Sequence, residues 1–434
     1  MGTNLQRNTM SHREVREGSN QDRREFLKTG AIAAGAAAFG GPLALPGRTG
    51  GAARRTTPKV TVVLFQRGGA DHLNIYAPTG DANYALLRPT IGLAAPGSGS
   101  GVVGLPMTAT FAMHPAMAGL HGAFGAPGSH VAVVHAVGYQ PFDRSHFTSQ
   151  DLYETALQPG SAPDGWINRH LQVTSTAQDA PVRALALRGA LPRSMTGAYP
   201  CYAVASTQDL VFVGQPDMRL FLEAITGSTP TGGMSAPAQL AYRSAQSAFD
   251  LIDRFGGLDP VNYQPANGAV YPSGALGQSL REIAEVVKAG LGVEFFAVDQ
   301  GGWDHHSDLV ARIAGYVGEL DQAITAFFTD LGALAADVVL VTMSEFGREA
   351  GENGSGGADH GVGGAMLVAG GAVLGGQVHG TWPGLAPAAL QDGRFLAPAN
   401  DFRDVLREVL ELHMGGTDPA VVFPGRVYQP IGVL

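Results

Sequence analysis

The sequence predicts an α/β fold built on a doubly wound, mostly parallel sheet. Short apolar runs rich in β-branched residues recur along the chain, and amphipathic helical stretches lie between and after them. Strands that alternate with helices form parallel sheets covered on both faces. No repeat of 20–50 residues is visible, which disfavours solenoids and propellers.

The expected strands are short and almost uniformly apolar, as buried strands are. They span residues 60–65, 131–137, 183–187, 293–298, 338–342 and 366–369. The expected helices repeat apolar residues at three- and four-residue steps, and they span 276–289, 309–334 and 402–413. One more helix is expected to begin near Ser145.

Residues 1–55 are interpreted as a targeting signal and linker in front of a single domain, 56–434. Arg23 and Arg24 form a twin-arginine string, and the Ala/Gly-rich stretch that follows is too weakly apolar for a stable transmembrane helix. A twin-arginine (Tat) signal delivers a folded protein to the Tat translocase. We therefore expect a periplasmic or extracellular protein without stable membrane insertion; the alternative is an ordinary basic tail.

Charge and composition exclude several classes of protein. The net charge is −9, and residues 1–55 carry +5, so the rest of the chain carries −14. An acidic body repels nucleic acid and anionic membranes, so neither is an expected partner. The three lysines lie outside any P-loop string, and no Gly-x-Gly-x-x-Gly follows the first strand. Cys201 is the single cysteine, so no intramolecular disulfide forms.

Carboxylates and imidazoles follow the expected strands at the points where these end. Ligands of open α/β sheets bind outside the carboxyl ends of the strands, so these residues are expected along one rim. Donors that converge from several strand ends suit a divalent metal. The expected ligands of one or two ions (zinc, manganese, calcium or magnesium) are Asp71, Asp304, His306, Glu345, Asp359 and His360. Turn-capping for Asp71, a salt bridge for Glu345 and an ordinary loop position for His360 are the open alternatives.

The segment Asp143-Arg144-Ser145-His146 precedes an expected helix and is the candidate place for a nucleophile. A helix N-terminus stabilises a bound anion and lowers the pKa of a nearby hydroxyl. Ser145 is the candidate nucleophile, His146 a ligand or base, and Arg144 a clamp for anionic oxygens. Alternatively, Asp143 or Ser145 is only the N-cap of that helix.

Several of these strings resemble a bacterial exported family known as domain of unknown function 1501. The resemblance runs from Leu64 to Gly425, behind a similar twin-arginine leader. The matching strings are 64–71, Arg144-Ser145-His146-Phe147 with Gln150-Asp151, Gly302-Trp303-Asp304-His305-His306, Ser344-Glu345-Phe346-Gly347-Arg348 with Asn353-Gly354, and Asp359-His360-Gly361. The family looks like a branch of the alkaline phosphatase and sulfatase superfamily, which implies that type of sheet and a metal centre that handles phosphate or sulfate esters.

The resemblance also implies roles. Asp71 resembles the first metal-binding carboxylate of the superfamily. Asp304 with His306 resembles the acid-plus-histidine pair that the superfamily contributes second, and His360 resembles the histidine that comes late in the superfamily's chains. Glu345-Phe346 stands where the superfamily has an Asp-His pair, so one imidazole is missing or replaced. No Cys-x-Pro-x-Arg or Ser-x-Pro-x-Arg string exists, which disfavours a formylglycine sulfatase mechanism.

The leading hypothesis is an exported metal-dependent hydrolase of phosphate, sulfate or related esters. An anionic ester would be the substrate, and Ser145 or a metal-activated water would attack it. The alternative is a non-catalytic exported binding or assembly protein that keeps the phosphatase-like fold.

Overall fold

The computed structural model describes residues 58–161, 163–176, 179–210, 235 and 249–434. The chain divides into two compact units, Met1–Leu43 with Val211–Asp253, and Ala44–Leu210 with Arg254–Leu434. All elements described below belong to the second unit. The expected twin-arginine signal, with Arg23 and Arg24, lies outside the described residues, so the division into signal and single domain stays a prediction.

Nine strands of the described chain form one sheet in the order β11-β5-β10-β9-β1-β8-β6-β7, with β12 also paired to β5. The strands are β1 (Val60–Gln66), β5 (Val131–Gly138), β6 (Ala184–Leu187), β7 (Tyr202–Val204), β8 (Phe295–Gln300), β9 (Val338–Met343), β10 (Gly364–Gly370), β11 (Val378–His379) and β12 (Asn400–Asp401). A smaller sheet has the order β2-β4-β3 and consists of β2 (Tyr76–Ala77), β3 (Leu105–Pro106) and β4 (Ala112–Met113).

The α/β class and the mostly parallel sheet are confirmed. All pairings of the large sheet are parallel except those of β10, which runs antiparallel to β5 and β9. Each of the six expected strands is found, although the run expected at 293–298 forms Phe295–Gln300. Every residue of β1, β5, β9 and β10 is buried, which explains why these strands are apolar on both faces.

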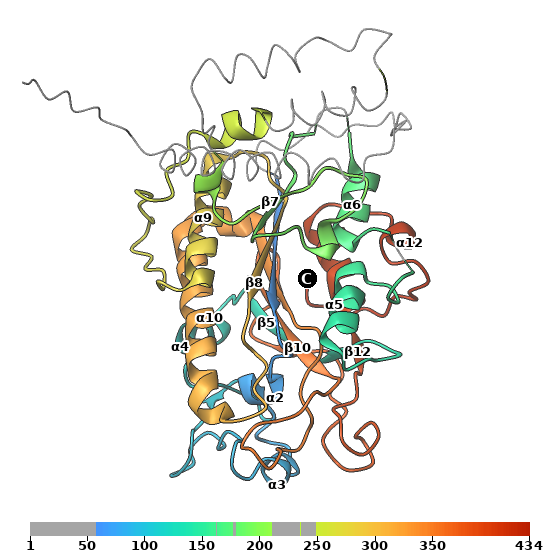
Figure 1. The fold of residues 1–434 in the computed structure, drawn as a ribbon. Helices are drawn as coiled ribbons and strands as arrows, with labels where there is room; N and C mark the ends of the chain where they lie inside the picture. The colour runs from blue at the N-terminus through green and yellow to red at the C-terminus, as the bar shows by residue number, and fades with distance from the viewer. Residues whose placement is uncertain (1–57, 162, 177–178, 211–234, 236–248) are drawn as a thin grey trace, which may run out of the picture. The chain divides into compact units, whose positions relative to one another are not determined.

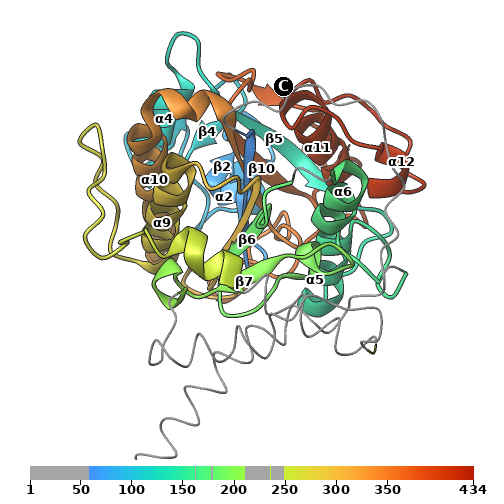
Figure 2. The ribbon, with the colours of Figure 1, turned by 90° about the horizontal axis from the view of Figure 1, so that it is seen from above.

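Helices cover both faces of the large sheet, as the doubly wound arrangement requires (Figures 1 and 2). One face carries α4 (Ala118–Phe124), α9 (Ala275–Ala289) and α10 (Leu309–Leu331). The other carries α5 (His146–Thr155), α6 (Trp166–Thr174), α11 (Phe402–Glu408) and α12 (Pro419–Val422). The remaining short helices are α2 (His72–Ile75), α3 (Tyr84–Leu87), η1 (Arg193–Met195), η2 (Thr207–Asp209), η3 (Gly332–Asp337) and η4 (Val409–His413).

The expected helices are present with altered ends. The helix expected at 309–334 stops at Leu331, because Gly332 has a φ of +53° and the chain tightens into η3. The helix expected at 402–413 changes into a π-helical turn at Val409. None of the described helices combines the length and the apolar character needed to cross a bilayer.

Helix α6 was not expected, because polar residues interrupt its apolar pattern. Asn168, Arg169 and His170 are nevertheless buried. The Asn168 amide donates to Met195 O and Tyr199 O, both at 2.8 Å. Partners from distant parts of the chain therefore make this polar segment a core helix.

The direction of β10 decides which residues reach the rim. Since β10 returns antiparallel beside β5 and β9, its first residue, Gly364, pairs with Val137 near the carboxyl end of β5. The loop 344–363 stays at that edge and brings Asp359 and His360 to the same rim as the residues that follow β1, β8 and β9.

Candidate metal centre

Three histidines and one aspartate meet at the carboxyl edge of the large sheet. His146 is the first residue of α5 and follows β5, Asp304 and His306 follow β8, and His360 precedes β10. His146, Asp304 and His360 each offer one donor atom, and these atoms all lie within 4.8 Å of one another, a group that could hold a metal ion. His306 joins them, since its Nε2 lies 3.0 Å from both Asp304 Oδ1 and His360 Nε2.

Asp304 touches all three imidazoles, which we call the histidine cluster (His146, His306 and His360). The Nε2 atom of His360 lies 3.2 Å from Asp304 Oδ1, and that of His146 lies 3.6 Å from Asp304 Oδ2. The side chains of Asp304 and His306 are 45% and 44% exposed. Solvent or a ligand can therefore reach the centre.

Each ring of the histidine cluster is oriented through its other nitrogen. The Nδ1 atom of His146 lies 2.8 Å from Glu345 Oε1, and that of His306 lies 2.7 Å from Asp359 Oδ1. The Nδ1 atom of His360 lies 2.9 Å from the backbone oxygen of Arg144. Metal-binding histidines are typically held in this way, by a carboxylate or a carbonyl on the nitrogen that does not face the metal.

These contacts turn the Nε2 atoms of His306 and His360 towards Asp304 Oδ1. A carbonyl oxygen only accepts, so His360 Nδ1 carries the proton, and the neutral ring turns its Nε2 lone pair towards Asp304 Oδ1. The Nδ1 atom of His306 faces Asp359, and its Nε2 likewise faces Asp304 Oδ1. The three atoms form a triangle with sides of 3.0, 3.0 and 3.2 Å. Ligands bound tetrahedrally at about 2.0–2.1 Å lie about 3.3 Å apart, so a cation fits this arrangement.

Arg348 holds the loops around the centre together. It is buried, and its guanidinium donates to Gly69 O at 2.6 Å, to Ala358 O at 3.0 Å and to Asp304 Oδ1 at 2.5 Å. Burial would raise the pKa of Asp304, but the hydrogen bond and the positive charge of Arg348 outweigh it and lower this pKa to about 2. Asp304 is therefore an anion at any ordinary pH.

Glu345 lies behind His146 and is fully buried. Its Oε1 accepts from His146, from Gln150 Nε2 at 2.9 Å and from Gly68 N at 2.9 Å. Burial would raise the pKa of Glu345, yet the hydrogen bonds from Gln150 and His146 outweigh it and lower the pKa. This carboxylate orients an imidazole.

Asp71 is not brought into this group. Both of its carboxylate oxygens lie 2.8 Å from Arg88 Nη1, and the pair is buried. Arg88 in turn donates to the backbone oxygens of Ala350, at 3.0 Å, and Glu349, at 2.6 Å. Asp71 therefore forms a salt bridge, the role that the sequence left open for Glu345.

The expected helix after Arg144 is present, and Ser145 occupies its N-cap position. The side chain of Ser145 is exposed and makes no capping hydrogen bond, while its N–H donates to Asp143 Oδ1 at 2.6 Å. The guanidinium of Arg144 lies 4.9 Å from the centre of the Phe395 ring. A free hydroxyl and a guanidinium thus directly precede His146 in the chain.

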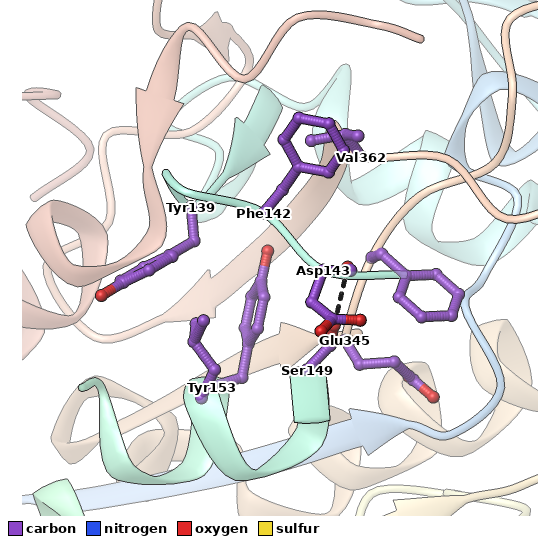
Figure 3. A pocket seen from close by; sticks show the side chains of 9 residues that line it. Tyr139, Phe142, Asp143, Ser149, Tyr153, Glu345 and Val362 are labelled. Atoms are coloured by element: carbon purple, nitrogen blue, oxygen red, sulfur yellow. Dashed lines mark hydrogen bonds between the residues drawn. The ribbon is translucent and has the colours of Figure 1, made fainter. Parts of the chain in front are cut away.

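Glu345 also lines a small pocket (Figure 3). Two of its lining residues are joined by the 2.8 Å hydrogen bond from Ser149 Oγ to Asp143 O. Its volume is about 10 Å³. That is room for about one water and too little for an ester substituent. The lining residues are Tyr139, Phe142, Asp143, Ser149, Leu152, Tyr153, Glu345, Phe346 and Val362.

Three residues that hydrogen-bond to the centre were not predicted to contribute to it. Arg348 and Gln150 stand in the strings that carry the family resemblance, and this resemblance was the one sequence feature that could have indicated them. Asn353 stands there too; its amide donates to His306 O at 2.9 Å and to Asp359 Oδ1 at 3.1 Å. Arg88 had no such signal, because Asp71 is 17 positions away and the two backbone oxygens that also accept from Arg88 are more than 260 positions away.

Fold and site together define an α/β protein with a candidate metal centre at the carboxyl edge of its sheet. Residues 58–422 match the family described as "Protein of unknown function (DUF1501)". The chain belongs to this family, as the sequence resemblance predicted. No curated protein matches the sequence.

Among solved structures, the chain is similar to a mutant of the TAB5 alkaline phosphatase with magnesium bound in its M3 site. The identity is 10% and the TM-score 0.30, and the match covers 73% of this chain and 91% of the phosphatase.

Proposed function

We propose that this protein is an exported, metal-dependent hydrolase of phosphate, sulfate or related esters. The observation that carries the proposal is the convergence of the histidine cluster on Asp304, with the Nε2 atoms turned towards its carboxylate. A divalent ion placed there supplies Lewis-acid chemistry, polarising an ester oxygen and easing the ionisation of water. The family resemblance stated from the sequence supports an anionic ester as substrate.

The residues of the chain prepare the site for an ion. Asp304 provides a full negative charge because Arg348 keeps its pKa low. Glu345 and Asp359 hold two of the rings with Nε2 towards Asp304, so the ligands need little reorganisation. Asp359 has a lowered pKa because His306 and Asn353 hydrogen-bond to it, and it therefore stays an acceptor.

Two groups could act on the ester. Ser145 has a free, exposed hydroxyl at the N-terminus of α5 and next to His146, where the helix dipole favours an anion. Arg144 is also exposed and could bind the anionic oxygens of the substrate. A water activated at the centre is the other nucleophile that this arrangement allows.

The test is metal analysis of the purified protein together with a panel of nitrophenyl phosphate, phosphodiester and sulfate substrates. Turnover should require the ion, disappear on chelation and disappear in Asp304→Ala. The matched control is Glu411→Ala, which removes a surface carboxylate paired with Arg407 and should leave turnover unchanged. In Ser145→Ala, loss of turnover identifies the hydroxyl as nucleophile, whereas retention favours water.

Bound metal without turnover on any ester contradicts the hydrolase. It supports instead the alternative of a non-catalytic exported binding or assembly protein.

Export through the Tat translocase is the second part of the proposal, supported by Arg23-Arg24 and the weakly apolar stretch after them. A fusion of residues 1–55 to a reporter should leave the cytoplasm, and the double change Arg23→Lys and Arg24→Lys should stop it. Export that survives the double change contradicts this route.

A further inference from the structure

We propose that the centre binds a single divalent ion, through Asp304 and the Nε2 atoms of the histidine cluster. The sequence allowed one or two ions and six ligands, but it could not show which carboxylates are already engaged in salt bridges or hydrogen bonds within the protein. This inference rests on the metal centre of the proposed function and does not depend on catalytic turnover.

Asp71 is withheld from an ion because a guanidinium contacts both of its oxygens, whereas Arg348 contacts only Oδ1 of Asp304. Both oxygens of Asp71 contact Arg88 Nη1 at 2.8 Å, and the side chains of Arg88 and Asp71 are 0% and 1% exposed. To bind an ion, Asp71 would have to release Arg88 and leave its charge buried and unpaired, which is strongly destabilising. Arg88 thus neutralises Asp71 in place of a metal.

Glu345 is withheld by hydrogen bonds. Its Oε1 already accepts from an imidazole, an amide and a backbone N–H, and its Oε2 lies 3.2 Å from Ser344 Oγ. Breaking these bonds in a fully buried position leaves donors unsatisfied. Glu345 therefore acts as a positioning residue for His146.

The donors that remain cannot serve two ions. A catalytic ion of this kind takes about three protein ligands. Any two sets of three drawn from Asp304, His146, His306 and His360 share two members, and at least one of these is an imidazole. The Nε2 atom of an imidazole has one lone pair and can bind one ion. A carboxylate can bridge two ions, but an imidazole nitrogen cannot, so the sets compete for the same ion.

The donors also indicate the class of ion. Imidazole nitrogens outnumber carboxylates by three to one, and imidazole suits zinc and its transition-metal neighbours. Magnesium and calcium prefer carboxylate, carbonyl and water oxygens. We therefore expect zinc rather than magnesium to be retained.

The experiment measures bound metal on the full chain. Protein stripped with a chelator is dialysed to equilibrium against Zn²⁺ or against Mg²⁺ at the same free concentration, and metal per chain is counted by elemental analysis. We expect one zinc per chain and no retained magnesium. Two zinc ions per chain, or retained magnesium without retained zinc, would overturn the inference.

Variants assign the ligands. Asp304→Ala and His360→Ala should each weaken zinc affinity at least 100-fold, whereas Asp71→Asn should change it less than threefold while lowering thermal stability. Glu411→Ala is the matched surface control. Loss of zinc from Asp71→Asn that circular dichroism shows to be folded overturns the inference. The zinc count of the unaltered chain tests it even if that variant does not fold.

The two proposals fail in different ways. One zinc per chain without turnover on any ester supports the single-ion centre and contradicts the hydrolase. Two ions per chain together with turnover contradict the single-ion centre and support the hydrolase. A chain that binds no ion contradicts both.

Discussion

The Nη2 atom of Arg348 lies 2.5 Å from Asp304 Oδ1, so a buried cation and the exposed aspartate of the candidate metal centre share one hydrogen bond. The same guanidinium also bonds the backbone of the loops after β1 and before β10, at Gly69 O and Ala358 O. Arg348 therefore connects the loops that carry the centre.

Arg348→Met should loosen the centre. Asp304 would lose the hydrogen bond that lowers its pKa, and the loop carbonyls would lose their donor, so zinc affinity should fall roughly 10- to 100-fold. Arg348→Lys should not restore it, because a lysine cannot reach several acceptors at once. Competition with a chelator measures the affinity. Arg394→Met, at a 58% exposed arginine, is the control, and equal losses in both variants would contradict the positioning role.

Gly68→Ala should displace the loop that carries Asp304. Gly68 has a φ of +119°, and a Cβ there would lie 2.7 Å from Asp304 N, so the loop after β8 would have to move. The expected result is weaker zinc binding together with a lower melting temperature. Gly97→Ala is the matched control, since Gly97 also has a positive φ, of +83°, but no atom within 4 Å. An unchanged zinc affinity in Gly68→Ala would contradict the close packing of the two loops.

Acidification should destabilise the fold through buried neutral histidines. His135 donates to Tyr76 O and accepts from Ala136 N, and burial lowers its pKa from 6.5 to about 4. Its unfolded form binds the proton more readily, so the stability is complete above about pH 6.5 and declines as the pH falls towards 4. The share of His135 is up to about 3 kcal/mol.

Urea unfolding at pH 7.5, 6, 5 and 4.5 should show this decline. His135→Asn should make the dependence on pH shallower, while His121→Asn, at a residue that is not buried, should leave the slope as it is. A slope that is identical in His135→Asn and the unaltered protein rules out this histidine as a source.

Glu408 should anchor the C-terminal segment. Its carboxylate is buried and accepts from Ile431 N at 2.6 Å, Gly432 N at 2.8 Å and Val433 N at 2.7 Å. Glu408→Ala leaves these donors without their acceptor, so we expect a loss of about 3 kcal/mol of unfolding free energy. Glu411→Ala, one turn later and at the surface, should cost less than about 1 kcal/mol. Carboxypeptidase should trim the tail faster in Glu408→Ala only; equal trimming would contradict the anchor.

The strands and most helices could be predicted because their signal is local. The apolar runs of β1, β5, β9 and β10 are continuous since both faces of these strands are covered, and the three- and four-residue steps of α9 and α10 report one buried face. Helix α6 does not show this apolar repeat. Its buried polar side chains form hydrogen bonds with residues that no local sequence pattern identifies as neighbours.

The candidate site was predicted in its location and only partly in its members. Asp304, His306 and His360 follow from polar residues at strand ends, and His146 from the start of a helix. Asp71 and Glu345 are also carboxylate residues that follow strands, yet both are engaged by protein donors.

The sequence by itself determined the α/β class, the membership of the family and the edge of the sheet where the candidate metal centre lies, since these depend on residue type and local order. Only the tertiary structure decided that Asp71 and Glu345 are engaged by protein donors, because that depends on where Arg88 and Gln150 place their N–H groups. A donor a few ångströms away in space can be hundreds of residues away in the chain, and no local pattern records it.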